Sequence, residues 1–179
     1  MLDPRSRFPG IIDTIPPDDG IARAGVLVPL FPDGDDIRMV LTKRPMTMPT
    51  HAGHLAFPGG RPDPDDPDVV HTALREAHEE MGIVPGDVDV LGYLEAIHTV
   101  EFSLYVVPVV GWLPPDPTLI PSEREVDKVL LPTISSLSNE DAWRFELWQG
   151  RRIWFFDIDG EVLWGATAML TRRLLGLEP

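Results

Sequence analysis

The sequence predicts one mixed α/β domain in which strands come first, then a helix, then more strands and a closing helix. Two observations predict this order. Apolar runs of strand length lie between clusters of glycine, proline and aspartate, and residues 70–81 and 164–177 repeat apolar residues at helical spacing. The 179 residues are enough for one domain with its own core, and no internal repeat or linker divides them.

The first part of the chain reads as an arm followed by a hairpin. Residues 1–20 are rich in proline and aspartate and show no sustained period, so we expect an irregular arm there and the domain itself over residues 21–179. The apolar runs 22–31 and 37–42 flank turn-forming residues, which predicts a β-hairpin. Residues 43–60 form a long loop whose final glycines, Gly59 and Gly60, permit a close backbone approach to a helix or a ligand.

The first helix is predicted from four apolar residues and from the residues at its two ends. The apolar residues recur at four-three-four spacing and predict a buried stripe, which consists of Val70, Leu74, Ala77 and Met81. An Asp-Pro-Asp sequence at residues 66–68 supplies candidates for the N-cap and the first turn, with Asp66 among them. Gly82 is suited to end the helix in a left-handed conformation.

Three carboxylates share the surface of this helix that we expect to face away from the stripe. Glu76 and Glu80 repel each other at four-residue spacing, and Glu79 and Glu80 lie near the negative end of the helix dipole, where an acid typically costs about 0.3–1 kcal/mol. Arg75 can neutralise one of the charges. A hard divalent cation bound through carboxylate oxygens would neutralise the others, whereas a solvated acidic face is the alternative for an arbitrary helix.

The second half of the chain reads as five strands, a short helical segment and a closing helix. The run 103–113 is almost continuously apolar, which predicts a central strand, and 114–124 is a proline-rich exposed loop. The other predicted strands are 88–98, 125–131 and a hairpin of 143–148 with 152–158, and a helical turn or short helix is predicted within 132–142. The closing helix carries a stripe of Ala166, Met169, Leu170 and Leu174.

Composition excludes several classes of protein. The net charge of −14 disfavours a partner recognised through a phosphate backbone, so we expect no nucleic-acid binding, although metal ions and a few arginines can reverse the field locally for a small phosphorylated ligand. The chain has no cysteine, which excludes disulfides and thiolate sites. No window is apolar enough to span a bilayer and no signal-peptide pattern is present, so we expect a soluble cytoplasmic protein without a membrane partner.

Residues 60–83 together resemble the Nudix box, whose pattern is G-x5-E-x7-R-E-U-x-E-E-x-G-U, with U an aliphatic residue. Residues 75–83 fit the carboxyl half of the pattern, with Ala77 as a small apolar member. Asp66 stands where the box has glutamate, and eight residues instead of seven separate it from Arg75. Asp66 therefore has two readings, as a box acid and as an N-cap.

An upstream signature resembles the coenzyme A pyrophosphatase branch of this family. That signature, L-L-T-x-R-[SA]-x3-R-x3-G-x3-F-P-G-G, is matched by residues 40–44, by Gly53 and by residues 57–60. Pro45 replaces the small residue and Pro49 replaces the second arginine. The loss of that arginine removes a cation from a segment where a phosphate-rich ligand could be bound.

The resemblance implies an α/β/α sandwich with a mixed central sheet, and a hydrolase that cleaves a pyrophosphate bond with Mg²⁺ or Mn²⁺. It implies that Glu76, Glu79 and Glu80 bind the metal, and that Arg75 orients a box glutamate. For this branch the substrate is coenzyme A or acyl-CoA, cleaved to 3′,5′-ADP and (acyl-)4′-phosphopantetheine. Alternative substrates are ADP-ribose, NADH, dinucleoside polyphosphates and noncanonical nucleoside triphosphates, and a non-catalytic nucleotide sensor is a further alternative.

Several assignments beyond the box remain open at this level. Glu125 is the first candidate for a general base, with Glu123 as its competitor. Lys43 and Arg44 are candidate phosphate-binding cations, against ordinary charges at the end of a hairpin. His51 and His54 are candidates for a substrate contact more than for a metal, because no further histidine or cysteine completes a zinc-like pattern. A tryptophan could stack on a base, and a homodimer is an arrangement that the sequence allows.

Overall fold

The structure is a computed structural model that describes residues 4–15, 23–99 and 104–178. Its centre is a mixed six-stranded sheet in the order β2-β1-β8-β6, with β5 paired to β1 and β7 paired to β8. The pair β1–β8 is parallel and the other pairs are antiparallel. The strands are β1 (Arg23–Asp33), β2 (Asp36–Met39), β5 (Gly59–Gly60), β6 (Asp89–Tyr93), β7 (Ile97–Thr99) and β8 (Leu104–Trp112).

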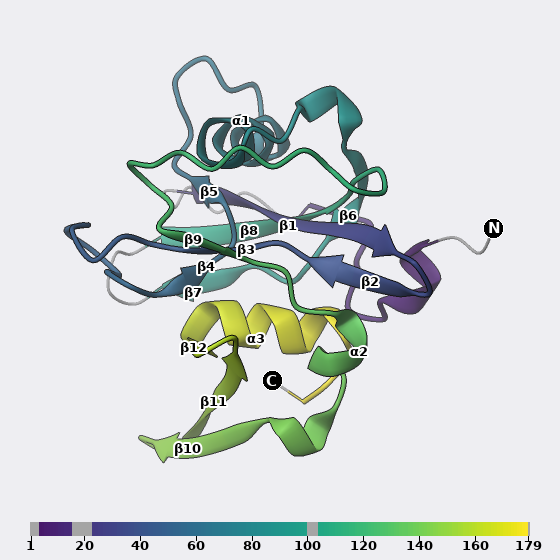
Figure 1. Cartoon of the computed structure of the whole chain (residues 1–179). Helices are drawn as coiled ribbons and strands as arrows, with labels where there is room; N and C mark the ends of the chain where they lie inside the picture. Colours follow the sequence, from purple (N-terminus) through teal and green to yellow (C-terminus); the bar gives the residue numbers. More distant parts are fainter. Residues whose placement is uncertain (1–3, 16–22, 100–103, 179) are drawn as a thin grey trace.

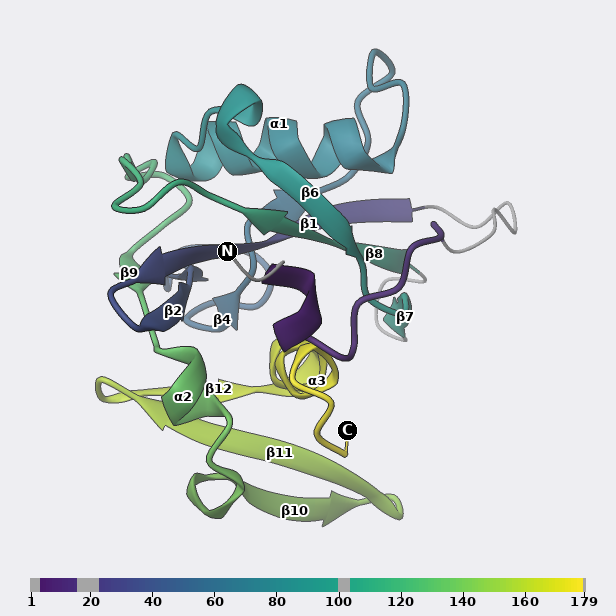
Figure 2. The ribbon, with the colours of Figure 1, turned by 90° about the vertical axis from the view of Figure 1, so that its right-hand side faces the viewer.

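Helices cover both faces of this sheet, as the predicted α/β/α sandwich requires. α1 (Val69–Met81) lies on one face and α3 (Gly165–Leu174) on the other (Figure 1). The view in Figure 2 shows a three-stranded sheet beyond α3, made of β10 (Arg144–Trp148), β11 (Arg151–Ile158) and β12 (Glu161–Trp164). A second small sheet contains β3 (Leu41–Lys43), β4 (Leu55–Ala56) and β9 (Lys128–Leu130).

The buried stripe of α1 is rotated relative to the prediction. Ala77 and Met81 are fully buried as expected, but Val70 and Leu74 are only half-buried, and Val69 and Ala73 complete the stripe. The reason is the close approach of α1 to Gly25 of β1, where a Cβ atom would lie 2.5 Å from the carbonyl oxygen of Val69. The rotation places Glu80 at 6% exposure, so the expectation that all three glutamates face away from the stripe is wrong for Glu80.

Two predicted strands are each divided between two elements. The run 37–42 becomes β2 and β3, which belong to different sheets, and the run 88–98 becomes β6 and β7. Each predicted strand is interrupted at a residue whose backbone hydrogen bond lies outside the regular strand pairing. Val40 donates its N–H to Pro29 O, and Leu94 donates its N–H to Pro108 O. The short strands β4, β5 and β12 lie in segments predicted as loop or as the start of the last helix.

The remaining elements follow the predictions closely. β8 is central, and the hairpin β10–β11 forms as predicted, as do α2 (Ile134–Leu137) and the 3₁₀ turn η3 (Glu140–Ala142) in the segment 132–142. In α3, Leu170 and Leu174 are buried but Ala166 is exposed, because it lies in the first turn beside the cavity described below.

The described part of the amino-terminal arm packs on the domain. It begins with the 3₁₀ turn η1 (Pro4–Arg7), and Phe8 is 1% exposed within the main core. Ile12 and Tyr93 exchange backbone hydrogen bonds of 2.8 and 2.9 Å. Within the described ranges, no helix is long and apolar enough to cross a membrane.

Candidate active site

The ends of α1 are capped, which fixes the position of every side chain on it. Asp68 is the N-cap, since its Oδ1 accepts the N–H of His71 at 2.9 Å. Gly82 ends the helix with φ 67°, a left-handed conformation that favours glycine, and its N–H donates to His78 O. The sequence placed a cap within residues 66–68, and the structure assigns it to Asp68 and not to Asp66.

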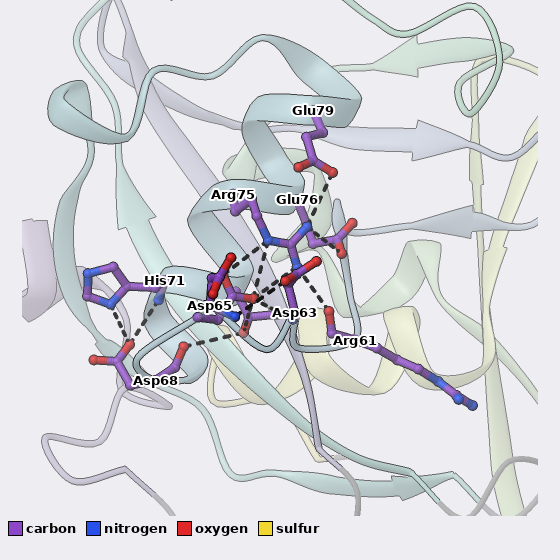
Figure 3. Close-up of polar contacts among 10 residues, drawn as sticks. Arg61, Asp63, Asp65, Asp68, His71, Arg75, Glu76 and Glu79 are labelled. Carbon is purple, nitrogen blue, oxygen red and sulfur yellow. Dashed lines mark hydrogen bonds and ion pairs between the residues drawn. The ribbon is translucent and has the colours of Figure 1, made fainter.

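Arg75 is the centre of a polar network on the outer side of α1 (Figure 3). Its guanidinium donates to both carboxylate oxygens of Asp66, with Nη2 to Oδ2 at 3.0 Å, and Nη2 also donates to Arg61 O at 3.0 Å. Nη1 lies 3.0 Å from Glu76 Oε1 and 3.2 Å from Glu79 Oε2. One arginine therefore holds two of the three box glutamates and the loop that precedes the helix.

Asp66 is an anchor for that arginine that is ionised at neutral pH. Its side chain is 7% exposed and also accepts hydrogen bonds from Asp63 N and Thr72 Oγ1, both at 2.9 Å. The hydrogen bonds from Arg75 are the largest cause that lowers the pKa of Asp66 to about 2. The same contacts raise the pKa of Arg75, so the pair stays charged.

Glu76 and Glu80 face the Gly59–Gly60 backbone of β5. The Glu76 carboxylate lies so close to Gly60 that a Cβ atom there would be 2.5 Å from Oε1. Glu80 accepts a hydrogen bond from the Gly59 N–H, which favours its ionised form, but burial dominates and raises the pKa of Glu80 to about 8. Burial also raises the pKa of Glu76. Glycines are needed in β5 because any side chain at Gly60 would displace a glutamate.

Glu125 is brought to these glutamates by the loop 114–124. Ile120 and Ser122 donate their N–H groups to Met81 O and Glu80 O, at 2.7 and 2.8 Å, so the loop is fastened to the carboxyl end of α1. The charge of Glu125 contributes to the raised pKa of both Glu76 and Glu80. The sequence named Glu125 as a candidate but gave no indication of this loop–helix contact.

The donor chemistry of this site fits a hard divalent cation. The charges of Glu79 and Glu125 raise the pKa of Glu76, and the charges of Glu125 and Glu76 raise that of Glu80, so a cation would relieve repulsion among these carboxylates; the side chain of Glu79 is 54% exposed. Over the residues that the structure describes, no three acidic or histidine side chains already stand in a metal-binding cluster. Glu76 and Glu80 interact through their charges, while Arg75 forms ion pairs with Glu76 and Glu79.

A cavity of about 590 Å³ opens beside Gly59 and Gly60. Arg44 lines it, and Arg44 Nε is buried without a hydrogen-bond partner among the described residues. The charge of Arg44 is also close enough to Glu80 to oppose the rise in its pKa. Lys43 is placed differently, because its Nζ bonds Glu161 Oε1 at 3.0 Å and it does not line the cavity.

Four further side chains at this cavity carry weak or no sequence signals. His51 and His54 line it, and the ring of His54 contacts Trp164 edge-on at a centroid distance of 4.7 Å. Trp164 is 40% exposed, and its ring also stacks on Phe155 at 6.3 Å. Arg61 lines the cavity as well, and no sequence signal marks it, because one arginine in a loop has no pattern around it.

Comparisons with known proteins find similarity over most of the chain. The family model of the NUDIX domain matches residues 22–155. The Nudix hydrolase NudL of Photorhabdus laumondii is 34% identical over 160 residues, covering 87% of this chain and 84% of that protein. Nudix hydrolase 22, chloroplastic, of Arabidopsis thaliana is 40% identical over 164 residues, covering 84% of this chain and 53% of that protein.

Solved structures with low identity share the fold. A MutT/nudix family protein from Enterococcus faecalis has a TM-score of 0.58 at 16% identity, covering 90% of this chain and 63% of that one. The Ap4A hydrolase of C. elegans has a TM-score of 0.54 at 20% identity, covering 64% of this chain and 82% of that one. With the family model across residues 22–155 and relatives aligned over most of its length, this chain belongs to the Nudix hydrolase family and is a pyrophosphohydrolase.

Proposed function

We propose that this enzyme hydrolyses the pyrophosphate bond of coenzyme A or acyl-CoA and releases 3′,5′-ADP and (acyl-)4′-phosphopantetheine. The observation that carries the proposal is the position of the upstream signature. Arg44, Phe57, Gly59 and Gly60, which belong to it, all line the cavity, and Gly60 and Gly59 also contact Glu76 and Glu80. The residues that distinguish this branch in sequence are therefore the residues that a substrate would meet.

In this proposal Glu76, Glu79 and Glu80 hold Mg²⁺ or Mn²⁺. Such a cation supplies charge neutralisation at the phosphates and makes a bound water more acidic. Arg75 keeps Glu76 and Glu79 in place, with Asp66 and Arg61 O fixing its own orientation. Arg44, which lines the cavity, would bind a phosphate oxygen through its guanidinium group.

The reaction is the attack of water on one phosphorus. A new bond forms between the water oxygen and that phosphorus, while the bond from the phosphorus to the bridging oxygen breaks and its electrons stay on the leaving phosphate. Glu125 accepts the proton that water loses. Positioning and electrostatic stabilisation provide most of the acceleration in such reactions.

The assay that tests the proposal is turnover of a substrate panel with Mg²⁺ or Mn²⁺, with products separated by chromatography. The panel contains coenzyme A, acyl-CoA species, ADP-ribose, NADH, Ap4A and noncanonical nucleoside triphosphates. We expect the highest kcat/KM for a coenzyme A species. A far higher value for another nucleotide would reject the coenzyme A proposal.

A second candidate function is cleavage of ADP-ribose or a dinucleoside polyphosphate. The observation that favours it is Pro49, which removes a cation that the coenzyme A signature places upstream of the glutamates. Among structures with the same fold, one is titled an Ap4A hydrolase and another a NUDIX domain complexed with ADP ribose. Tight binding without turnover, unchanged in Glu79→Gln, would instead indicate a nucleotide sensor.

A further inference from the structure

The cavity continues from Gly59–Gly60 across the face of the central sheet that is opposite α1. Paired residues of neighbouring strands form the floor of the cavity. Val26 is opposite Gly59, Ala24 is opposite Val106, and Val106 is opposite Ile97. Side chains alternate along a strand, so Ala24 and Val26 share one face, while Gly25 between them meets α1. An apolar strip therefore begins at the candidate catalytic loop and crosses β1, β8 and β7.

The walls above this strip are mostly apolar, with Phe57 and Trp164 as aromatic members. Leu55 and Ala56 come from β4, Ala166 and Leu170 come from α3, and Leu104 extends the strip along β8. The Thr167 hydroxyl, which lies on the same side, already donates to Leu55 O at 3.0 Å. The backbone of the floor is occupied by strand pairing. This part of the cavity therefore suits a chain of methylene groups.

A nucleobase would fit this part of the cavity poorly. Its ring nitrogens and exocyclic groups need hydrogen-bond partners, and each buried group left without one costs free energy. Of the charged side chains that line the cavity, Arg61 directly follows Gly60 and Arg44 acts on the pKa of Glu80, so both lie toward the Gly59–Gly60 end, whereas His54 contacts Trp164. The cavity thus has a cationic end at Gly59–Gly60 and a largely apolar remainder.

We infer that the aliphatic part of this cavity is an acyl-binding subsite, and that the enzyme prefers acyl-CoA thioesters to free coenzyme A. The inference rests on the proposed function, because it places the pyrophosphate at the Gly59–Gly60 end and the thioester arm over Ala24, Val106 and Ile97. The volume of about 590 Å³ lies within the range of small-molecule sites, roughly 300–1,000 Å³. The adenosine part then extends from the cationic end toward solvent.

The test is a binding measurement that needs no catalysis. Isothermal titration calorimetry with EDTA compares S-acetyl-, S-butyryl-, S-hexanoyl- and S-octanoyl-4′-phosphopantetheine with 3′,5′-ADP, and turnover of the matching acyl-CoA series is measured separately with Mg²⁺. Burying one methylene is worth a factor of roughly two to four in affinity. We expect Kd to fall by that factor for each methylene until the subsite is full, with KM following the same trend.

A matched pair of variants ties this effect to the cavity. Ala166→Trp fills the subsite from an exposed helix position, so the fold tolerates it, and it should remove the chain-length dependence. Val162→Trp adds the same side chain at an exposed site outside the cavity and should leave the dependence intact. Leu147→Ser, at an exposed leucine of β10, should also leave it intact, which controls for acyl chains bound to exposed apolar surface.

Each outcome decides one of the two proposals. A Kd that does not change with chain length, or a dependence that persists in Ala166→Trp, overturns the acyl subsite even if coenzyme A is hydrolysed. Chain-length-dependent binding that Ala166→Trp abolishes supports the subsite. If in addition no coenzyme A species is turned over, the proposed reaction fails and the binding subsite stands.

Discussion

The Asp66 carboxylate accepts a hydrogen bond from the Arg75 guanidinium, with 3.0 Å between Oδ2 and Nη2, and the two residues are nine positions apart in the sequence. Both departures of this sequence from the Nudix box concern this pair. Aspartate is one methylene shorter than glutamate, and the chain inserts one extra residue before Arg75. The hydrogen bond from Asp63 N at 2.9 Å holds the loop in a turn that brings Asp66 to the arginine.

Asp66→Ala should lower both activity and stability. Arg75 would lose its main anchor, and changes that misorient groups around a metal site typically cost about 10–100-fold in activity. Loss of hydrogen bonds to a charged group should also reduce the free energy of unfolding by about 1.5–3 kcal/mol. The checks are kcat/KM and urea denaturation.

Asp68→Ala is the matched control for that variant. It removes the N-cap of α1 and should cost about 1 kcal/mol of stability, while activity stays near that of the wild type. Equal losses of activity in the two variants would show that helix stability alone explains the role of Asp66.

The Asp66–Arg75 pair should also give a pH-dependent stability at low pH. The pKa of Asp66 is lowered to about 2 in the folded protein, so its contribution is present above the unfolded value near 4 and is lost as pH falls to 2. The difference in unfolding free energy between wild type and Asp66→Asn should shrink by about 2 kcal/mol over that range. Urea titrations at pH 6, 4 and 2.5 measure it, and a constant difference would contradict the assignment.

The sequence predicted the elements with long repeating patterns and missed those that depend on contacts between distant segments. α1, β1, β8 and the hairpin β10–β11 follow from periodicity and turn residues. The two-residue strands β4 and β5 have no pattern of their own and exist because β3 and β1 accept them as partners.

The candidate site divides in the same way. The box identified Glu76, Glu79 and Glu80 from their spacing. It could not reveal that Glu80 is buried, because burial depends on the close approach of α1 to Gly25. The sequence also could not show that Lys43 and Arg44 have different surroundings, because Lys43 bonds Glu161, which is 118 positions away.

Glu80→Gln should remove activity without destabilising the metal-free protein. Burial and the charges of Glu125 and Glu76 oppose the charged form of Glu80 and raise its pKa to about 8, so a neutral amide suits this position in the metal-free protein, and its carbonyl oxygen can still accept the Gly59 N–H. Activity should fall by more than about 100-fold, since even indirect changes at metal sites cost 10–100-fold. Thermal unfolding should show an unchanged or higher Tm without metal and a smaller rise on adding Mg²⁺. Unfolding of the metal-free variant would count against this account.

Glu125→Gln and Glu123→Gln test the assignment of the general base. The charge of Glu125 acts on Glu76 and Glu80, and loss of a proton acceptor typically costs about 100–10,000-fold in rate. We expect a fall of that size in kcat for Glu125→Gln, with the acid limb of the pH–rate profile altered. Glu123→Gln changes the same loop and should behave as the wild type. The reverse pattern would assign the base to Glu123.

Arg44→Ala and Lys43→Ala separate substrate binding from fold stability at two adjacent cations. Arg44 lines the cavity, and its buried Nε has no hydrogen-bond partner among the described residues. Hydrogen bonds to charged groups are worth about 1.5–3 kcal/mol, so the loss of Arg44 should raise KM by about 10–100-fold. Lys43 has a side chain 19% exposed that bonds Glu161, so its loss should lower Tm by a few degrees and leave KM unchanged. Steady-state kinetics and thermal unfolding of both variants check this, and a raised KM in Lys43→Ala alone would reverse the two roles.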